Sequence, residues 1–264
     1  MKRHNHSNSN AFCEKYAGVT PVYDRIGDNY SQTRQEDSRW KDLITEALGD
    51  ARTVLNVGAG TGSYEPTDRY VLAVEPSSTM RAQRPPTSAP SLVGVAEDLP
   101  FDDDSFDLTL AILTVHHWGD IERGVSELRR VGRRTIVLSY DMRIQRSFWL
   151  TRDYIPEIAE AEITRVPSIE KLHSLLEPAE IKPMPVWHDH EDGVMTAYWQ
   201  RPDCLLEPKV RLSCSALRLT NHESVSRGLG RLSKDLLSGE WDRKYGALRE
   251  QKTYDAGFRL IAAG

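Results

Sequence analysis

Short apolar segments alternate with amphipathic ones along the first half of the chain. Residues 38–48 carry apolar side chains at helical spacing and stop at Gly49, so they predict a helix. Residues 53–57 are mostly β-branched or apolar, which is typical of a strand buried in a parallel sheet. Further strands are expected at 71–74, 92–95, 106–113 and 135–140, with helices at 77–83 and 121–130. This alternation predicts an α/β fold with a doubly wound, mostly parallel, Rossmann-like sheet.

Two insertions interrupt the alternation in the second half of the chain. A helix is expected at 168–176, a strand at 181–187 that two prolines push toward a sheet edge, and a last strand at 257–262. The residues between these two strands show helical spacing, and long structureless loops are uncommon, so we expect a helical cap over the carboxyl edge of the sheet. The expected division is an N-terminal tail and segment (1–36), a core (37–146, 167–194 and 253–264), a first insert (147–166) and the helical substrate cap (195–252).

Gly58, Gly60 and Gly62 follow the first predicted strand directly. They place a bare backbone loop at the carboxyl edge of the sheet, where open α/β folds bind their ligands. A dinucleotide-binding loop has G-x-G-x-x-G, but Ser63 stands at the third position, and the short interval before the next strand leaves little room for a helix facing a pyrophosphate. Glu75 ends the second strand, where its carboxylate can accept hydrogen bonds from both hydroxyls of a ribose. The pattern favours a ribose-bearing ligand and weakens the alternative of a NAD(P)-dependent reductase.

Composition and charge exclude several classes of partner. The 264-residue chain has a formal net charge of −5, so it lacks the positive field that attracts nucleic acid. Its N-terminus is polar, and no stretch reaches the ~18 apolar residues of a membrane-spanning helix, so no membrane anchor is expected. The three cysteines lack C-x-x-C spacing, which is typical of free thiols in a reducing cytoplasm. We expect a cytoplasmic protein without a nucleic-acid or membrane partner, and the oligomeric state stays open.

One polar cluster, HDHED at 188–192, is a candidate metal site. Alternating histidines after a strand can converge on an ion, but alternation also sends neighbouring side chains to opposite faces. Polar residues at a strand exit usually form a solvated turn, and no metal is therefore expected here.

Three motifs in register resemble class I S-adenosylmethionine-dependent methyltransferases, in the subgroup of ubiquinone/menaquinone and natural-product small-molecule methyltransferases. They are VLNVGAGTG at 54–62, VLAVEPSSTM at 71–80 and GVAEDLPFDDDSFDLTLAILTVHHW at 94–118. The third is the most specific, because a strand, a short turn, an acidic loop and S-F-D opening the next strand rarely occur together by chance. The resemblance covers residues 50–140 and implies S-adenosyl-L-methionine as the cofactor.

The resemblance also implies which residues would meet the cofactor. The glycine loop would approach its methionine and ribose parts, and Glu75 would hold the ribose hydroxyls. Residues 22–37 resemble the family's N-terminal cofactor-covering segment, which implies Tyr30 at the sulfonium end and Arg34 at the carboxylate. The full implied set is Tyr30, Arg34, Gly58, Ala59, Gly60, Gly62, Glu75, Pro76, Ser77, Ala96, Glu97, Leu99, Ala111, Ile112 and His116.

Two positions depart from the family pattern. An acidic residue is usual where Asn56 stands, and Asn56 cannot supply a charge to the methionine ammonium. An aspartate is usual where Val95 stands, and its carboxylate would accept from the adenine amino group. These departures concern the affinity for the cofactor, and they keep open a non-catalytic regulatory protein that binds S-adenosylmethionine.

The chemistry implied by the resemblance needs few protein groups. Methyl transfer is an in-line displacement at a carbon that the sulfonium activates, so a base is needed only where the acceptor must lose a proton. His116 and His117 follow the fourth predicted strand and titrate near neutrality, which makes them the candidate catalytic bases, although a structural role stays open. Tyr16, Tyr23 and Tyr140 are weaker alternatives.

The two inserts are expected to hold the methyl acceptor. Their tryptophans and arginines can line a largely apolar pocket with a few orienting cations, although tryptophans in a helical cap also form its core. The acceptor is expected to be a small natural product or another aromatic or apolar metabolite, methylated on oxygen, nitrogen or carbon. The predicted substrate-binding residues are Tyr16, Tyr23, Tyr140, Trp149, Trp199 and Arg201.

Overall fold

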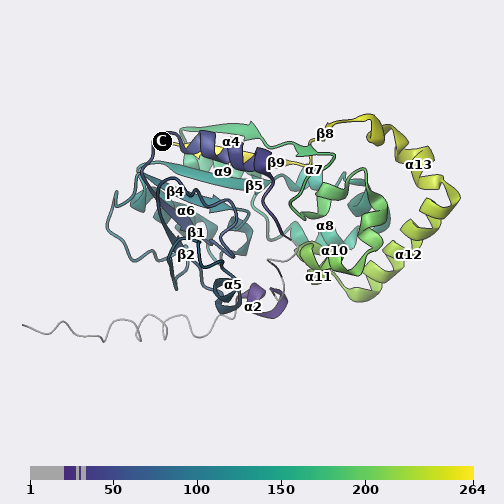
Figure 1. Cartoon of the computed structure of the whole chain (residues 1–264), viewed down its shortest axis with the longest axis horizontal. Coiled ribbons are helices and arrows are strands. Elements are labelled where there is room, and N and C mark those ends of the chain that lie inside the picture. The colour runs from purple at the N-terminus through teal and green to yellow at the C-terminus, as the bar shows by residue number, and fades with distance from the viewer. Residues whose placement is uncertain (1–20, 28–29, 31–33) are drawn as a thin grey trace, which may run out of the picture.

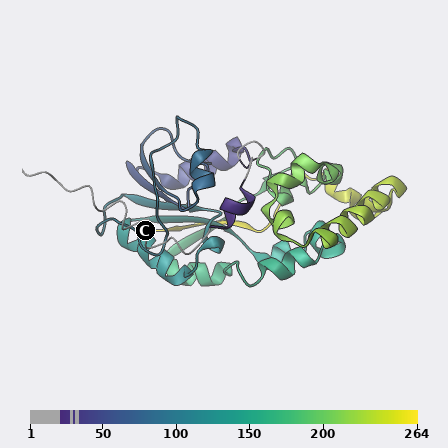
Figure 2. The ribbon, with the colours of Figure 1, turned by 90° about the horizontal axis from the view of Figure 1, so that it is seen from below.

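The computed structural model describes residues 21–27, 30 and 34–264. It divides into a sheet with helices on both faces and a lobe built mostly of helices, which lie side by side in Figure 1 and Figure 2. The predicted tail and Tyr16 fall outside the described residues. Within them, no helix is long and apolar enough to cross a membrane.

The central sheet has the predicted doubly wound, mostly parallel arrangement. Its strand order is β3-β2-β1-β4-β5-β9-β6. The first five strands in this order are parallel to one another, and β9 runs antiparallel to both β5 and β6. Because the chain order reverses between β1 and β4, the carboxyl ends of these two strands form the switch point where such sheets bind ligands. The strands are β1 (Thr53–Val57), β2 (Tyr70–Val74), β3 (Ser91–Leu92), β4 (Leu108–Ile112), β5 (Thr135–Tyr140), β6 (Ala179–Pro183) and β9 (Phe258–Ala263).

Alternate residues of β5 show how both faces of the sheet are covered. Ile136 and Leu138 pack in one apolar core together with Trp40 of helix α4 (Ser38–Leu48). Val137, between them, packs in a second core with residues of α6 (Ile121–Val131) and α9 (Ile169–Leu176). Burial on both faces explains why the parallel strands are almost continuously apolar.

Side-chain caps fix where the core helices begin. Asp37 caps α4, Ser77 caps α5 (Ser78–Ala82), Asp120 caps α6 and Ser168 caps α9, each by accepting a hydrogen bond from a backbone N–H in the first turn. The predicted cap at Ser77 is confirmed.

The structure corrects two predicted strands. The third strand has two residues instead of the predicted 92–95. The strand predicted at 181–187 is two strands, β6 at the sheet edge and β7 (Val186–Trp187), which pairs with β8 (Thr253–Tyr254). Pro183 and Pro185 lie at the break, and their missing backbone N–H groups remove ladder bonds there.

The helical lobe has a core rich in tryptophan. Trp149, Trp199 and Trp241 are fully buried, or nearly so, and the Trp149 indole N–H donates to the Trp199 carbonyl at 2.8 Å. The remaining elements are α2 (Val22–Ile26) in the N-terminal segment, η1 (Val115–His117) after β4, and, after β5, α7 (Met142–Gln145), η2 (Leu150–Tyr154), α8 (Glu157–Glu162), η3 (Met195–Tyr198), η4 (Pro202–Leu206), α10 (Pro208–Ser213), α11 (Ser215–Leu219), α12 (His222–Ser238), α13 (Glu240–Tyr245) and η5 (Gly246–Glu250).

Two glycines in α12 test how this helix packs against the rest of the lobe. A Cβ at Gly228 would lie 2.3 Å from Ile155 Cγ1 and 2.6 Å from the Tyr154 carbonyl oxygen, whereas a Cβ at Gly230 would meet nothing within 4 Å. We expect Gly228→Ala to lower the free energy of unfolding by about 1–3 kcal/mol through overpacking. The matched control, Gly230→Ala, should raise it by about 0.5–1 kcal/mol, because alanine has the higher helix propensity. Urea denaturation of both variants measures the difference, and equal effects would contradict this packing.

Candidate active site

The three glycines after β1 adopt conformations that side chains rarely permit. Their φ angles are +68° at Gly58, +54° at Gly60 and +93° at Gly62. A Cβ at Gly58 would lie 2.0 Å from Thr114 Oγ1, so the loop packs directly against the segment that follows β4. The loop also joins β2, because the backbone N–H of Gly58 donates to the Val74 carbonyl at 2.8 Å.

Glu75 ties this glycine loop to the turn after β2. Its carboxylate is buried and accepts from the Gly60 N–H and the Ser77 N–H, both at 2.8 Å. Burial raises the pKa of Glu75, against the opposing effect of these hydrogen bonds. Each oxygen of a carboxylate can accept a further bond, so the group is suited to hold the hydroxyls of a ribose between the loop and the turn.

A buried ion pair, instead of a helix, follows the glycine loop. In the described chain, no helix lies between β1 and β2, as the short interval predicts. Instead, the Arg84 guanidinium donates to both carboxylate oxygens of Glu65 at 2.8 Å, with both side chains buried. The Asn56 amide donates to Glu65 Oε1 at 3.0 Å. Sequence reasoning missed this pair, which places a carboxylate beside Asn56 but neutralises it with arginine.

The residues expected at the adenine edge (Ala96, Glu97 and Leu99) and two of those expected on the methionine side (Ala111 and Ile112) separate into different surroundings. Ala96, Leu99 and Ala111 are buried in the core with α6, while Ile112 packs toward the opposite core. The Glu97 carboxylate accepts from the Gly119 and Asp120 N–H groups at 2.7 and 3.1 Å, so it is held at the beginning of α6.

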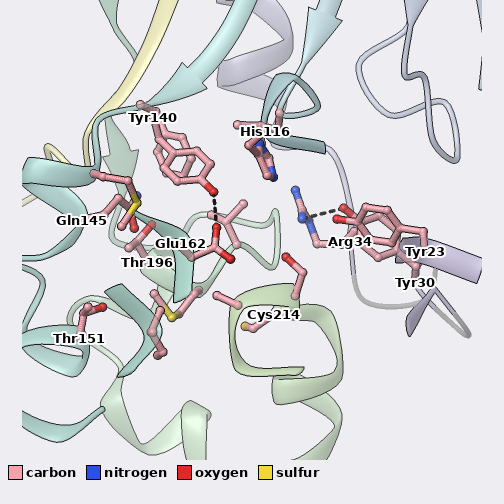
Figure 3. Close-up of a pocket in the computed structure, with 18 residues that line it drawn as sticks. Tyr23, Tyr30, Arg34, His116, Tyr140, Gln145, Thr151, Glu162, Thr196 and Cys214 are labelled. Carbon is pink, nitrogen blue, oxygen red and sulfur yellow. Dashed lines mark hydrogen bonds between the residues drawn. The ribbon is translucent and has the colours of Figure 1, made fainter. Parts of the chain in front are cut away.

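A cavity lies between the N-terminal segment, the ends of β4 and β5, and the helical lobe (Figure 3). It measures about 710 Å³ when the open space at its mouth is included. The structure brings five predicted residues together here, from three separate parts of the chain: Tyr23, Tyr30, Arg34, His116 and Tyr140. The rest of the lining is Leu113, Met142, Gln145, Thr151, Ile158, Glu162, Val194, Met195, Thr196, Cys214, Ser215, Ala216 and Phe258.

Arg34 is held at the cavity by a carboxylate that sequence reasoning did not assign. Its Nε and Nη2 both donate to Asp192, and its Nη1 donates to the Tyr30 hydroxyl at 2.8 Å. Asp192 is 1% exposed and also accepts from the Tyr64 hydroxyl at 3.0 Å. The positive charge of Arg34 is therefore already paired, which limits its capacity to bind the carboxylate of a ligand.

Two residues of the polar cluster at 188–192 have different buried partners. Asp192 pairs with Arg34, as described above. His190 Nδ1 lies 3.0 Å from Asp37 Oδ2, and both of these side chains are buried. Among the described residues, no group of three or more histidine, cysteine, aspartate or glutamate side chains could hold a metal ion.

Both candidate histidines are neutral at neutral pH. Burial, followed by the charges of His117, Arg165 and Arg34, lowers the pKa of His116 well below its ordinary value. Burial and then Arg165, whose Nη2 lies 3.2 Å from His117 Nδ1, lower the pKa of His117 to about 4. His116 lines the cavity, and His117 packs against it with ring centroids 4.0 Å apart and the ring planes tilted by 47°.

Glu162 is the cavity residue that sequence reasoning missed. It ends α8, is buried, and its Oε2 accepts from the Tyr140 hydroxyl at 2.9 Å. Arg165 Nη1 donates to the other oxygen, Oε1, at 3.2 Å. A signal was present in the sequence, because Glu162 stands four residues after Ile158 and therefore on the same, inward face of the helix.

Three predicted substrate-binding residues lie away from the described cavity walls. Trp149 and Trp199 pack in the core of the lobe, and Arg201 donates to the carbonyls of His190 and Ala197 at 3.1 and 3.0 Å. All three side chains make their contacts within the lobe. For the two tryptophans, this agrees with the alternative that tryptophans of a helical cap form its core.

Comparison with known proteins gives these features a family context. Residues 55–136 match the family model of a methyltransferase domain. An uncharacterized methyltransferase of Mycobacterium tuberculosis is 38% identical over 112 residues, which are 38% of this chain and 44% of that protein. A demethylmenaquinone methyltransferase of Renibacterium salmoninarum is 32% identical over 125 residues, which are 43% of this chain and 50% of that protein. The chain thus spans half or less of the length of these curated relatives.

One solved structure is similar over most of the chain. It is the crystal structure of a provisionally assigned methyltransferase from an antibiotic biosynthesis pathway of Anabaena variabilis. The two chains are 33% identical with a TM-score of 0.81, and the match covers 88% of this chain and 99% of that one. The similarity therefore extends beyond the sheet into the helical lobe.

The neutral histidines predict a loss of stability in mild acid. The unfolded chain protonates His117 near pH 6.5, whereas the folded chain does so only near pH 4, so stability falls as the pH falls between these values. We expect His117→Gln to remove about 2 kcal/mol of this loss between pH 7 and 4.5. The control is His222→Gln, at an exposed position. Urea unfolding at both pH values measures the slope, and identical slopes for all three proteins would contradict the burial of His117.

Proposed function

Because the chain belongs to the class I S-adenosylmethionine-dependent methyltransferases, we propose that it transfers the methyl group of this cofactor to a small-molecule acceptor in the cavity of Figure 3. The observation that carries the proposal is the contact between the glycine loop and the cavity wall. Thr114 packs on Gly58, while its neighbours Leu113 and His116 line the cavity. A cofactor on the glycine loop would thus meet an acceptor in the cavity across one short segment.

The residues around the loop fit the proposed cofactor. Glu75 offers acceptor capacity to the ribose hydroxyls, and the glycines allow the backbone to approach. The cofactor, when bound, supplies a methyl group on a sulfonium sulfur that is activated for displacement. The protein then has to align the acceptor and exclude water, which the covering segment with Tyr23 and Tyr30 and the helical lobe can do together.

The walls of the cavity favour a neutral, largely apolar acceptor. Leu113, Ile158, Met195 and Phe258 supply apolar surface. The charged groups of the described cavity walls are paired, Arg34 with Asp192 and Glu162 with Arg165, so these walls offer no unpaired charge of either sign. Walls of this kind suit a small aromatic metabolite better than a charged macromolecule. The similarity to a demethylmenaquinone methyltransferase supports the same class of acceptor.

Binding of S-adenosylhomocysteine, the demethylated cofactor, tests this proposal directly. We expect isothermal titration to detect it, and Glu75→Ala to weaken it about 10- to 100-fold through loss of charge-assisted hydrogen bonds. Glu180→Ala, on the exposed edge strand β6, is the matched control and should bind like the unaltered protein.

Two outcomes would contradict the proposal in different ways. Binding of NADPH without binding of S-adenosylhomocysteine would make the chain a nicotinamide protein. Binding of S-adenosylhomocysteine by a protein that methylates none of a broad panel of phenols, amines and quinols would favour the non-catalytic regulatory alternative.

A further inference from the structure

We infer that the acceptor presents a hydroxyl group, as phenols and enols do, to the Tyr140–Glu162 pair, and that Glu162 receives the proton released on methyl transfer. This inference rests on the proposed function. It assigns a role to a carboxylate that no motif in the sequence identifies.

The pair stands where an acceptor would bind. Tyr140 ends β5 and Glu162 ends α8, so the two side chains reach the cavity from the sheet and from the lobe. Figure 3 shows their hydrogen bond, 2.9 Å long, within the space that the lining residues enclose. Both residues line the cavity, and Glu162 is 7% exposed.

The hydrogen bond between Tyr140 and Glu162 leaves the Tyr140 oxygen able to accept a hydrogen bond from a ligand. The Tyr140 hydroxyl donates its single proton to Glu162 Oε2, so its oxygen can only accept from another group. Burial, followed by the nearby charge of Glu162, raises the pKa of Tyr140, which therefore stays protonated and neutral. A hydroxyl on the acceptor can donate to Tyr140, and its own lone pair is then free to face the methyl group.

The neighbouring histidines are poorer proton acceptors than this pair. Burial, together with the positive charge of Arg165, lowers the pKa of both His116 and His117, and Arg34 adds to the effect at His116. The other titratable groups facing the pair are Tyr23, Tyr30 and Cys214. Glu162 alone of the described cavity-lining side chains carries a negative charge, and Arg165 holds that carboxylate in place.

The proposed step balances without a further reactant. A bond forms between the acceptor oxygen and the methyl carbon, and the bond from that carbon to sulfur breaks with its electron pair left on sulfur. The acceptor proton passes to the Tyr140 oxygen while the Tyr140 proton passes to Glu162. The positive charge of the sulfonium is thereby replaced by a proton on the Glu162 carboxylate.

An ionisable phenol tests the inference without knowledge of the natural acceptor. The probe is 7-hydroxycoumarin, whose absorbance reports its ionisation, titrated with pH in the presence of saturating S-adenosylhomocysteine. We expect it to bind the unaltered protein. In Glu162→Gln, the pKa of the bound probe should fall by about one unit or more, because a negative charge beside its hydroxyl is gone and Arg165 loses its partner.

Two further variants separate charge from structure. Glu160→Gln, on the exposed side of the same helix, removes a charge away from the cavity and should leave the pKa of the bound probe unchanged. Tyr140→Phe keeps the charge of Glu162 but removes the hydroxyl between it and the probe, so the probe should bind about tenfold more weakly. Thermal unfolding of each variant establishes that it is folded.

Each result decides the inference. A probe that fails to bind, or whose pKa is the same with Glu162→Gln and Glu160→Gln, would overturn it. Failure of S-adenosylhomocysteine to bind in the same titrations would instead overturn the proposed function. If S-adenosylhomocysteine binds but the probe does not, or if the probe has the same pKa in both variants, the proposed function stands and Glu162 has no role as the proton acceptor.

Discussion

A single buried carboxylate, that of Asp192, joins the N-terminal segment and the lobe, which both line the cavity, to the loop after β1. It accepts from Arg34 of the N-terminal segment and from Tyr64 of the loop after β1, and it precedes the residues of the lobe that line the cavity. A carboxylate that is 1% exposed is costly unless its charge is matched and its lone pairs are used. The segment over the cavity is held by polar contacts, since α2 has no buried residue: besides this pair, Asp24 accepts from the Ser77 hydroxyl and from the Thr79 N–H.

Charge pairing also sets the chemistry available inside the cavity. Arg34 and Arg165 each have a carboxylate partner, and burial, followed by neighbouring charges that include these two arginines, lowers the pKa of His116 and keeps it neutral. A site with paired charges and neutral histidines has little attraction for an ion, but it has several groups that exchange hydrogen bonds with a neutral ligand. The cavity thus selects by shape and by hydrogen bonding rather than by net charge.

Periodicity predicts the sheet well, because each element is decided by its own residues. The expected bounds of β1, β5 and α4 agree with the structure, and residues placed at the ends of β4 and β5 do meet, since parallel strands bring their carboxyl ends to one edge. Glu162 and Asp192 were missed because their importance lies in partners from distant parts of the chain. Composition alone also could not separate a tryptophan that lines a pocket from one that fills a core, as Trp149 does.

The missing helix after β1 narrows what the glycine loop can bind. In dinucleotide-binding folds, that helix directs its N-terminus at a pyrophosphate, and its dipole and free N–H groups hold the negative charge. In the described chain no helix lies between β1 and β2, and Arg84, which pairs with Glu65, also donates to the Gly60 carbonyl at 3.3 Å. The loop therefore offers a bare backbone and the Glu75 carboxylate, which match a ribose, but no helix end after β1 for a phosphate. A nucleoside without phosphates is the ligand that this arrangement fits.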